Sequence, residues 1–279
     1  MNLFTFAKQI PPLLTAKLWR AVIEFQLIQP NDRVAIGFSG GKDSIFLLFL
    51  LAALKEKFPF SFDLHALHID NGFAPAEEGE HMRAELTRYC EEIGIPFTIH
   101  RLPMEEIWES KDGKSPCFVC ARHRRGALAR LAKDLGFNKL ALAHHQDDAV
   151  ESFVMSLFQS GQLRTFSPLS YMDRSDITVI RPLALMREQE IIQAVDQLPW
   201  VPLKNPCPYQ GETERIHTRE WLLSQESEFP GLFDKLSRAM RKDQVKDLWP
   251  PLPTRKELQV GFEEFWQKKT PKKDKEFSK

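Results

Sequence analysis

Six consecutive residues, Ser39-Gly40-Gly41-Lys42-Asp43-Ser44, form the segment of this chain best suited to bind a phosphate group. The paired glycines let the backbone turn tightly and direct successive N–H groups at one anion. A helix expected after the loop adds its positive N-terminal end, and the lysine adds a full charge. The spacing from glycine to lysine is too short for the GxxxxGKS/T loop of kinases and GTPases. The segment therefore predicts a phosphate loop of another kind, with a purely structural glycine turn as the alternative.

Three of the four cysteines occupy positions from which they could hold a metal. Cys117 and Cys120 lie at the entrance of an expected helix, whose N-terminal end favours the thiolate form. Cys207 lies in the rigid segment Asn205-Pro206-Cys207-Pro208. No fourth ligand is evident nearby, although structural zinc normally takes four, whereas three thiolates suit a 4Fe–4S cluster with one open iron. The cluster is the leading interpretation, zinc and redox or structural thiols are the alternatives, and Cys90 is interpreted as a core residue.

Strand and helix patterns alternate along the chain after residue 33. This alternation predicts an α/β fold with a parallel sheet that helices cover on both faces. Buried-strand patterns lie at 34–38, 63–69, 96–100, 139–143 and 178–180. Helical patterns lie at 43–57, 76–93, 120–135 and from about 149 to 159.

Three loops that carry polar or charged side chains follow strands of the expected sheet. They comprise residues 39–44, 70–72 and 144–148. Ligands of parallel sheets bind outside the carboxyl ends of the strands, where such loops meet. The three loops are therefore expected to form one site.

Composition shifts divide the chain into four expected parts. Residues 1–30 form an N-terminal helical segment, and 31–198 form the α/β domain. Prolines exclude helix just after residue 199, so residues 199–249 are expected to contain the cysteine-bearing loop and two short helices, at 213–225 and 233–248. Residues 250–279 are expected to be a disordered basic tail, because the last 12 residues hold six lysines and two acids.

The overall composition excludes several classes of protein. Thirty-eight basic residues balance 38 acidic ones, which excludes a uniformly basic coat for nucleic acid but permits a local basic patch. No apolar run approaches the ~20 residues of a membrane span, and the N-terminus lacks a secretory signal pattern. Four cysteines are too few for a disulfide scaffold. We therefore expect a cytoplasmic protein with no membrane partner.

Four ordered motifs, together with Cys207, resemble those of one enzyme family. SGGKDS (39–44) after a strand resembles the pyrophosphate loop of the N-type ATP pyrophosphatases, the PP-loop superfamily. CFVCARHRRG (117–126), AHHQDD (143–148) and RPLALMRE (181–188) resemble segments of the tRNA 2-thiocytidine synthetase family within that superfamily.

The likeness spans about residues 30 to 230. Two features depart from the family pattern. Ala143 replaces a glycine, and Tyr209 and Gln210 stand where many members carry a further cysteine. Neither departure removes a residue that the chemistry of the family needs, but both leave room for a divergent substrate.

The resemblance implies an adenine nucleotide alpha hydrolase-like fold and an ATP-dependent tRNA-cytidine sulfurtransferase. Such an enzyme transfers AMP to the C2 carbonyl of an anticodon-loop cytidine with release of pyrophosphate, and sulfur then displaces AMP. AMP transfer is needed because the carbonyl oxygen itself is a poor leaving group. The resemblance also implies ATP, Mg²⁺ and a 4Fe–4S cluster, a homodimer, tRNA as partner, and a cysteine desulfurase or free sulfide as sulfur donor.

The resemblance assigns roles to individual residues. ATP contacts fall to Ser39, Gly40, Gly41, Lys42, Asp43, Ser44, His68, Asp70 and His144. Catalysis falls to Asp148, Asp147 and Lys42, cluster ligation to Cys117, Cys120 and Cys207, and contact with tRNA phosphate to Arg124 and Arg125. Two of these residues also have a structural alternative: Asp43 could cap its helix, and His144 could form a hydrogen bond within its turn.

Three other functions fit part of the pattern. Thiolases that act on uridine or on a non-tRNA acceptor share the phosphate loop, although the uridine enzymes commonly carry paired CxxC zinc modules. An amide-forming ligase of the lysidine synthetase type needs no cysteine trio. A non-catalytic zinc-stabilised RNA-binding module leaves the phosphate loop unexplained.

Overall fold

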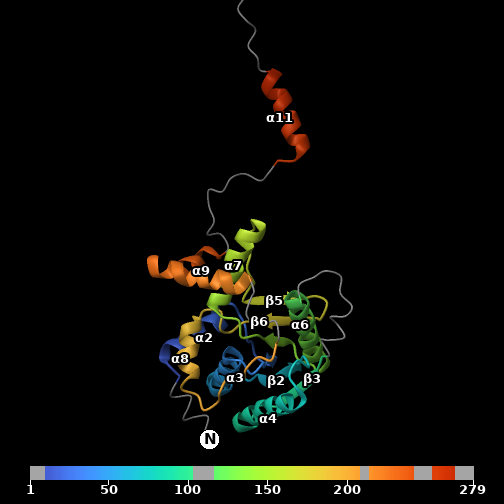
Figure 1. The fold of residues 1–279 in the computed structure, drawn as a ribbon, viewed down its shortest axis with the longest axis vertical. Coiled ribbons are helices and arrows are strands. Elements are labelled where there is room, and N and C mark those ends of the chain that lie inside the picture. Colours follow the sequence, from blue (N-terminus) through green and yellow to red (C-terminus); the bar gives the residue numbers. More distant parts are fainter. Residues whose placement is uncertain (1–9, 103–115, 208–213, 242–252, 268–279) are drawn as a thin grey trace, which may run out of the picture. The chain divides into compact units, whose positions relative to one another are not determined.

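A mixed sheet, parallel except at one edge, forms the centre of the unit Met1–Met240 (Figure 1). The computed structural model describes residues 10–102, 116–207, 214–241 and 253–267. The strand order is β3-β2-β1-β4-β6-β5, and only the edge strand β5 runs antiparallel to its neighbour. The strands are β1 (Arg33–Gly37), β2 (Asp63–Asp70), β3 (Phe97–Arg101), β4 (Lys139–Ala141), β5 (Leu169–Met172) and β6 (Ile177–Ile180).

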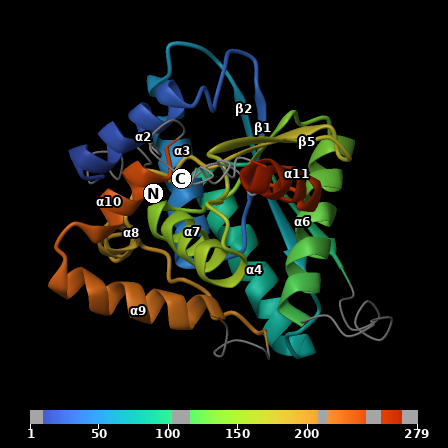
Figure 2. The same ribbon diagram turned by 90° about the horizontal axis from the view of Figure 1, so that it is seen from above.

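Helices cover both faces of the sheet, as the sequence predicts (Figure 2). Side chains alternate along a strand, so Val34 and Ile36 belong to the core that contains apolar residues of α2, α3, α4 and α8, whereas Ala35 belongs to the core that contains those of α6. The helices are α2 (Pro12–Glu24), α3 (Lys42–Leu54), the 3₁₀ turn η1 (Lys55–Lys57), α4 (Ala76–Ile93), α6 (Pro116–Asp134), α7 (Gln146–Ser160), α8 (Glu188–Val195), α9 (Glu214–Glu228) and α10 (Leu232–Ala239).

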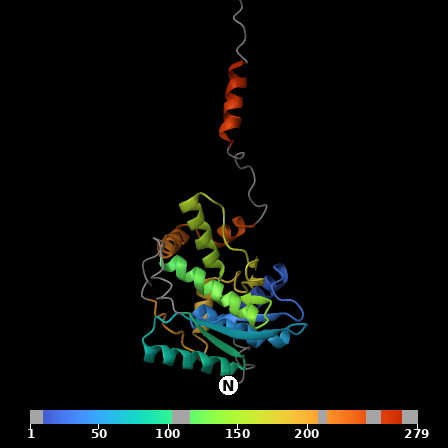
Figure 3. The same ribbon diagram turned by 90° about the vertical axis from the view of Figure 1, so that its right-hand side faces the viewer.

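Helices α7 and α9 pack side by side (Figure 3). The chain divides into two units, Met1–Met240 and Arg241–Lys279, and the second contains helix α11 (Arg255–Gln267). No helix among the described residues combines the length and the apolar character that crossing a membrane requires.

Several elements differ from the sequence expectation. Strand β5 and helix α8 were not expected, because both are short, and α10 ends at Ala239, well before residue 248. Helix α11 lies inside the segment 250–279, for which we expected disorder. A reciprocal cap explains its start: Thr254 N donates to Glu257 Oε2 at 2.6 Å, and Glu257 N donates to Thr254 Oγ1 at 3.2 Å. The lysine-rich end, 268–279, lies outside the described residues.

The order of the strands fixes where a ligand can bind. From β1 the chain proceeds to β2 and β3 on one side, whereas β4, β6 and β5 lie on the other. The order therefore reverses between β1 and β4, and a crevice opens beyond the carboxyl ends of strands at such a point. The loops 38–41 and 142–145 leave β1 and β4 at this crevice.

A buried ion pair fastens the opposite ends of these two strands. Lys139 Nζ lies 2.8 Å from Asp32 Oδ2 and 2.7 Å from the carbonyl oxygen of Leu27. The Nδ2 group of Asn138 donates to the other carboxylate oxygen of Asp32 at 2.8 Å. This network joins the segment before β1 to the start of β4, so it holds together the strands that form the crevice.

Replacing Lys139 with Met should lower the free energy of unfolding by about 3–5 kcal/mol, because the buried Asp32 carboxylate loses its counter-ion. Adding Asp32→Asn should restore part of the loss. The exposed pair Lys133–Asp176 provides the control, since Lys133→Met should cost less than about 1 kcal/mol. Urea denaturation measures all of these variants. Equal losses for the Lys139 and Lys133 variants would contradict the role assigned to the buried pair.

Candidate functional site

A cavity of about 480 Å³ opens at the crevice between β1 and β4. Its volume lies within the range of small-molecule sites. Besides the strand ends, its wall includes residues of α6, the segment Leu203–Pro206 and Arg215 of α9. The structure brings the following sequence-predicted residues to this wall: Ser39, Gly41, Asp43, Ser44, His68, Asp70, Arg124, Arg125, His144 and Asp148.

The glycine turn of the phosphate loop is sterically required. Gly40 has φ +81°, and a Cβ atom there would lie 2.9 Å from Leu86 Cδ2 and 3.1 Å from Leu203 Cδ1. The carbonyl oxygen of Gly40 accepts a hydrogen bond from Leu203 N at 2.9 Å. The segment that leads to Cys207 is therefore fastened directly to the phosphate loop.

Two serine hydroxyls fix the remainder of the loop. Ser44 Oγ donates to the Gly41 carbonyl oxygen at 2.9 Å and accepts from Ser39 N at 3.2 Å. The two serine Oγ atoms lie 3.1 Å apart. These bonds fix the conformation of the loop and of the first turn of α3.

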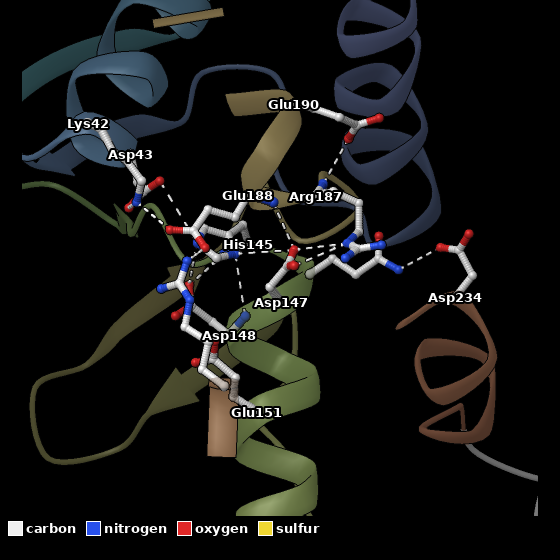
Figure 4. A network of polar contacts seen from close by, with 12 residues as sticks. Lys42, Asp43, His145, Asp147, Asp148, Glu151, Arg187, Glu188, Glu190 and Asp234 are labelled. Atoms are coloured by element: carbon white, nitrogen blue, oxygen red, sulfur yellow. Dashed lines mark hydrogen bonds and ion pairs between the residues drawn. The ribbon is translucent and has the colours of Figure 1, made fainter. Parts of the chain in front are cut away.

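Lys42 lies in an ion-pair network, shown in Figure 4. Its Nζ atom lies 2.9 Å from Asp43 Oδ2 and 2.7 Å from Oε1 of the buried Glu188, which also pairs with Arg219 of α9. The sequence expectation placed Lys42 on phosphate, but in the structure Lys42 does not line the cavity. Its partner Glu188 lies 146 residues further along the chain, so sequence spacing could not associate the two side chains.

Asp148 is the member of the acidic pair that lines the cavity. It closes a capping box at the start of α7: His145 N donates to Asp148 Oδ2 at 3.0 Å, and Asp148 N donates to His145 Nδ1 at 3.4 Å. Arg215 Nη1 donates to Oδ1 at 3.0 Å. Burial alone would raise the pKa of Asp148, but the His145 ring and amide, His144 and Arg215 together hold that pKa below its usual value.

Asp147 differs from the catalytic expectation. It is buried, and its carboxylate accepts from Glu188 N at 2.8 Å and from Arg187 Nε at 3.1 Å (Figure 4). Burial raises its pKa against the opposing effect of Arg187. Because adjacent residues on a helix point in different directions, only Asp148 reaches the cavity, and Asp147 links α7 to α8.

The remaining predicted polar residues of the wall have distinct environments. Burial lowers the pKa of His144 to about 4, and no described residue hydrogen-bonds its buried Nδ1 atom. Burial also lowers the pKa of His68, whose Nδ1 atom lies 2.8 Å from the Phe38 carbonyl oxygen. Both imidazoles are therefore neutral near pH 7. Asp70 accepts from Gly72 N at 2.9 Å and from Arg83 Nη1 at 2.8 Å.

Two of the three predicted cluster cysteines lie beside this cavity. Cys120 is half-buried on α6, and the next residue, Ala121, lines the cavity. Cys207 lines an adjoining depression, and Pro206 lines both hollows. The side chain of Cys117 lies outside the described residues, and the described side chains alone contain no group of three metal-ligating residues. Thiolates are the ligands that iron–sulfur clusters take, so Cys120 and Cys207 have the side-chain chemistry of cluster ligands.

Sequence reasoning missed four residues of the site. Arg187 and Glu188 belong to the RPLALMRE motif, but the motif does not identify their partners. Arg215 belongs to no motif and reaches the site through the packing of α9 on α7. Glu151, one turn after Asp148, is buried, and no described residue hydrogen-bonds its Oε1 atom.

Burial and the neighbouring Asp148 raise the pKa of Glu151 from 4.5 to about 7. Between these values the unfolded chain releases a proton that the folded protein keeps, so stability falls as the pH rises from about 4.5 to 7. Glu151→Gln cannot ionise. Its free energy of unfolding relative to the unsubstituted protein should therefore rise by about 3 kcal/mol between pH 4.5 and pH 8. Denaturant unfolding at both values tests this, and a difference independent of pH would contradict it.

Comparison with known proteins gives consistent matches. The model of the PP-loop domain family matches residues 14–217. A tRNA-cytidine(32) 2-sulfurtransferase of Aliivibrio fischeri is 36% identical over 228 residues, which cover 79% of this chain and 71% of the relative. A protein of the same name from Pelobacter propionicus is 38% identical over 225 residues, which cover 79% and 82%.

One solved structure shows the same fold at low sequence identity. The U34-tRNA thiolase NcsA of Methanococcus maripaludis, determined with its 4Fe–4S cluster, superposes with a TM-score of 0.69 at 22% identity. The superposition covers 90% of this chain and 86% of the thiolase.

Proposed function

The chain belongs to the PP-loop family, within which its relatives are named tRNA-cytidine(32) 2-sulfurtransferases, and from this premise we propose that it uses ATP to replace the C2 oxygen of tRNA cytidine 32 with sulfur. The observation that carries the proposal is one cavity whose wall joins a preformed phosphate loop, Asp148 and the arginines of α6. The loop is suited to bind the phosphates of ATP, Asp148 lies where the carbonyl would react, and the arginines are suited to contact the tRNA backbone.

ATP binds with its β and γ phosphates on the loop. The backbone N–H groups after Gly40 and the N-terminal end of α3 supply the attraction, and the hydroxyls of Ser39 and Ser44 keep the loop in shape. His68, Asp70 and His144 line the part of the cavity next to this loop, where the adenosine has room. Lys42 acts within the loop through its ion pairs with Asp43 and Glu188.

Adenylation is the first chemical step. The C2 oxygen of cytidine forms a bond to the α-phosphorus while the bond to the bridging oxygen breaks, and its electron pair leaves with pyrophosphate. The base carries a positive charge that the new phosphodiester balances, so no proton has to leave in this step. Asp148, on the cavity wall and ionised, stands where it can orient the reacting groups and offset this positive charge.

Sulfur transfer completes the reaction. A hydrosulfide-level nucleophile attacks C2, AMP departs with the C2 oxygen, and the proton on sulfur is released. Cys117, Cys120 and Cys207 would hold a 4Fe–4S cluster, which when bound supplies an open iron for sulfur. Asp43 would hold Mg²⁺, because its Oδ1 atom is buried and accepts no hydrogen bond from any described residue. Asp147 serves to position α8.

Nucleoside mass spectrometry of bulk tRNA tests this function. Cells that lack the gene should lose 2-thiocytidine, and the intact gene should restore it, whereas Cys207→Ser and Asp148→Ala should leave less than about a hundredth of it. The matched control is Cys90→Ala, since burial raises the pKa of the Cys90 thiol to about 12 and leaves it inert. Unchanged 2-thiocytidine without the gene would overturn the proposal.

Arg124 and Arg125 are proposed to contact tRNA phosphates, because both are exposed on α6 and line the mouth of the site. Replacing both with alanine should weaken tRNA binding and reduce the slope of log K against log salt by about 1.5 to 2. Arg122→Ala with Arg130→Ala is the control, since both are exposed on the same helix and neither lines the cavity. Equal slopes for the two double variants would exclude this assignment.

The oligomeric state and the sulfur donor are proposals as well. A homodimer is supported by Leu13 and Ile23, which are 58% and 74% exposed on α2 and would be covered by a second subunit. A cysteine desulfurase or free sulfide is the proposed sulfur donor, since either supplies sulfur at the required oxidation level. A cytoplasmic location is also proposed, because the proposed acceptor is tRNA.

A further inference from the structure

Arg215 brings a positive charge from the C-terminal helices into the wall of the reaction cavity. It is the second residue of α9, and its side chain is 43% exposed. Lys204, Arg124 and Arg125 are the other basic residues among the described residues of this wall. Arg215 differs from the two α6 arginines because both ends of its guanidinium are fixed by contacts with α7.

Two hydrogen bonds and one longer ion pair set the position of this guanidinium. Nη1 donates to Asp148 Oδ1 at 3.0 Å, and Nη2 donates to Ser152 Oγ at 3.0 Å. Nη1 also lies 3.9 Å from Glu151 Oε2. A guanidinium has five N–H donors, so donors remain after these two bonds are made. The side chain is thus both held in place and able to bind a further oxygen.

A fixed cation in a partly enclosed site is well suited to a phosphoryl group that undergoes substitution. Donors that are positioned before the reaction need no rearrangement while charge redistributes, and this is the usual source of large electrostatic effects. Exposed arginines on a helix surface lose side-chain entropy on binding and so contribute less per contact. Of the arginines on this wall, Arg215 alone combines a fixed guanidinium with direct contact to Asp148.

We propose that Arg215 is a catalytic residue that donates a hydrogen bond to a non-bridging oxygen of the ATP α-phosphate while the substrate carbonyl attacks phosphorus. The inference rests on the proposed function. In the step it assists, the carbonyl oxygen bonds to the α-phosphorus, the bond to the bridging oxygen breaks, and the electron pair leaves with pyrophosphate. Arg215 neutralises phosphate charge that would otherwise oppose the approach of the carbonyl oxygen, and its bond to Asp148 keeps it in place.

The test measures tRNA-dependent pyrophosphate release by the full-length protein with ATP and with each diastereomer of ATPαS, in which sulfur replaces one non-bridging α-oxygen. Arg215→Ala should lower kcat by about 100-fold or more while KM for ATP changes little, and Arg215→Lys should recover part of the rate. The control is Arg238→Ala on α10, whose side chain is exposed and bonds to the carbonyl oxygen of Asp234 in its own helix.

The diastereomers separate contact with phosphate from mere support of the fold. Sulfur at the contacted oxygen should slow the unsubstituted enzyme and cause no further slowing in Arg215→Ala, because the hydrogen bond is already absent. A sulfur effect of the same size in both proteins, or a kcat equal to that of Arg238→Ala, would overturn the proposal. Thermal unfolding of each variant confirms that the compared proteins are folded. If the unsubstituted protein releases no pyrophosphate, the proposed function fails, and this inference fails with it.

Discussion

The buried carboxylate of Asp147 is the interaction on which the site depends. It accepts hydrogen bonds from Arg187 and from the amide of Glu188, so it joins the start of α7 to the start of α8. Arg187 also donates to Glu226 on α9, and Glu188 forms an ion pair with Lys42 of the phosphate loop. A buried charge is tolerated only when it is paired and hydrogen-bonded, so each member of this chain of contacts constrains the next.

This interaction gives Asp147 and Asp148 different roles and connects distant parts of the site. Asp147 points into the protein and holds the helices, which leaves Asp148 on the cavity wall with Arg215 beside it. Glu188 at the start of α8 pairs with Lys42 of the phosphate loop, and the segment leading to Cys207 is hydrogen-bonded to Gly40 of the same loop. The same set of contacts therefore fixes the positions proposed for ATP and for the cluster. A substitution that moves the phosphate loop is expected to move the segment that carries Cys207 as well.

Much of this architecture could be predicted from the sequence, because it follows from short-range pattern. Apolar runs such as 34–38 identify buried strands, and glycine beside lysine identifies the phosphate loop. The pairing of Lys42 with Glu188 could not be predicted, since nothing local in the sequence relates two side chains so far apart along the chain. Arg215 was missed for the same reason: its role comes from how α9 packs on α7. The four residues of β5 form too short a pattern to be recognised as a strand. Helix α11 was not predicted because the segment around it is rich in charged residues, which favours a prediction of disorder.

The central claim is that the oxygen lost from the base leaves with AMP, because ATP activates the carbonyl at the α-phosphorus. A tRNA or anticodon arm that carries oxygen-18 at C2 of the acceptor cytidine tests this claim most directly. After reaction with unlabelled ATP and a sulfur donor, mass spectrometry should find one oxygen-18 atom in AMP and none in pyrophosphate, in step with the appearance of 2-thiocytidine. Thiolated product accompanied by unlabelled AMP, or by ADP and phosphate, would contradict the account.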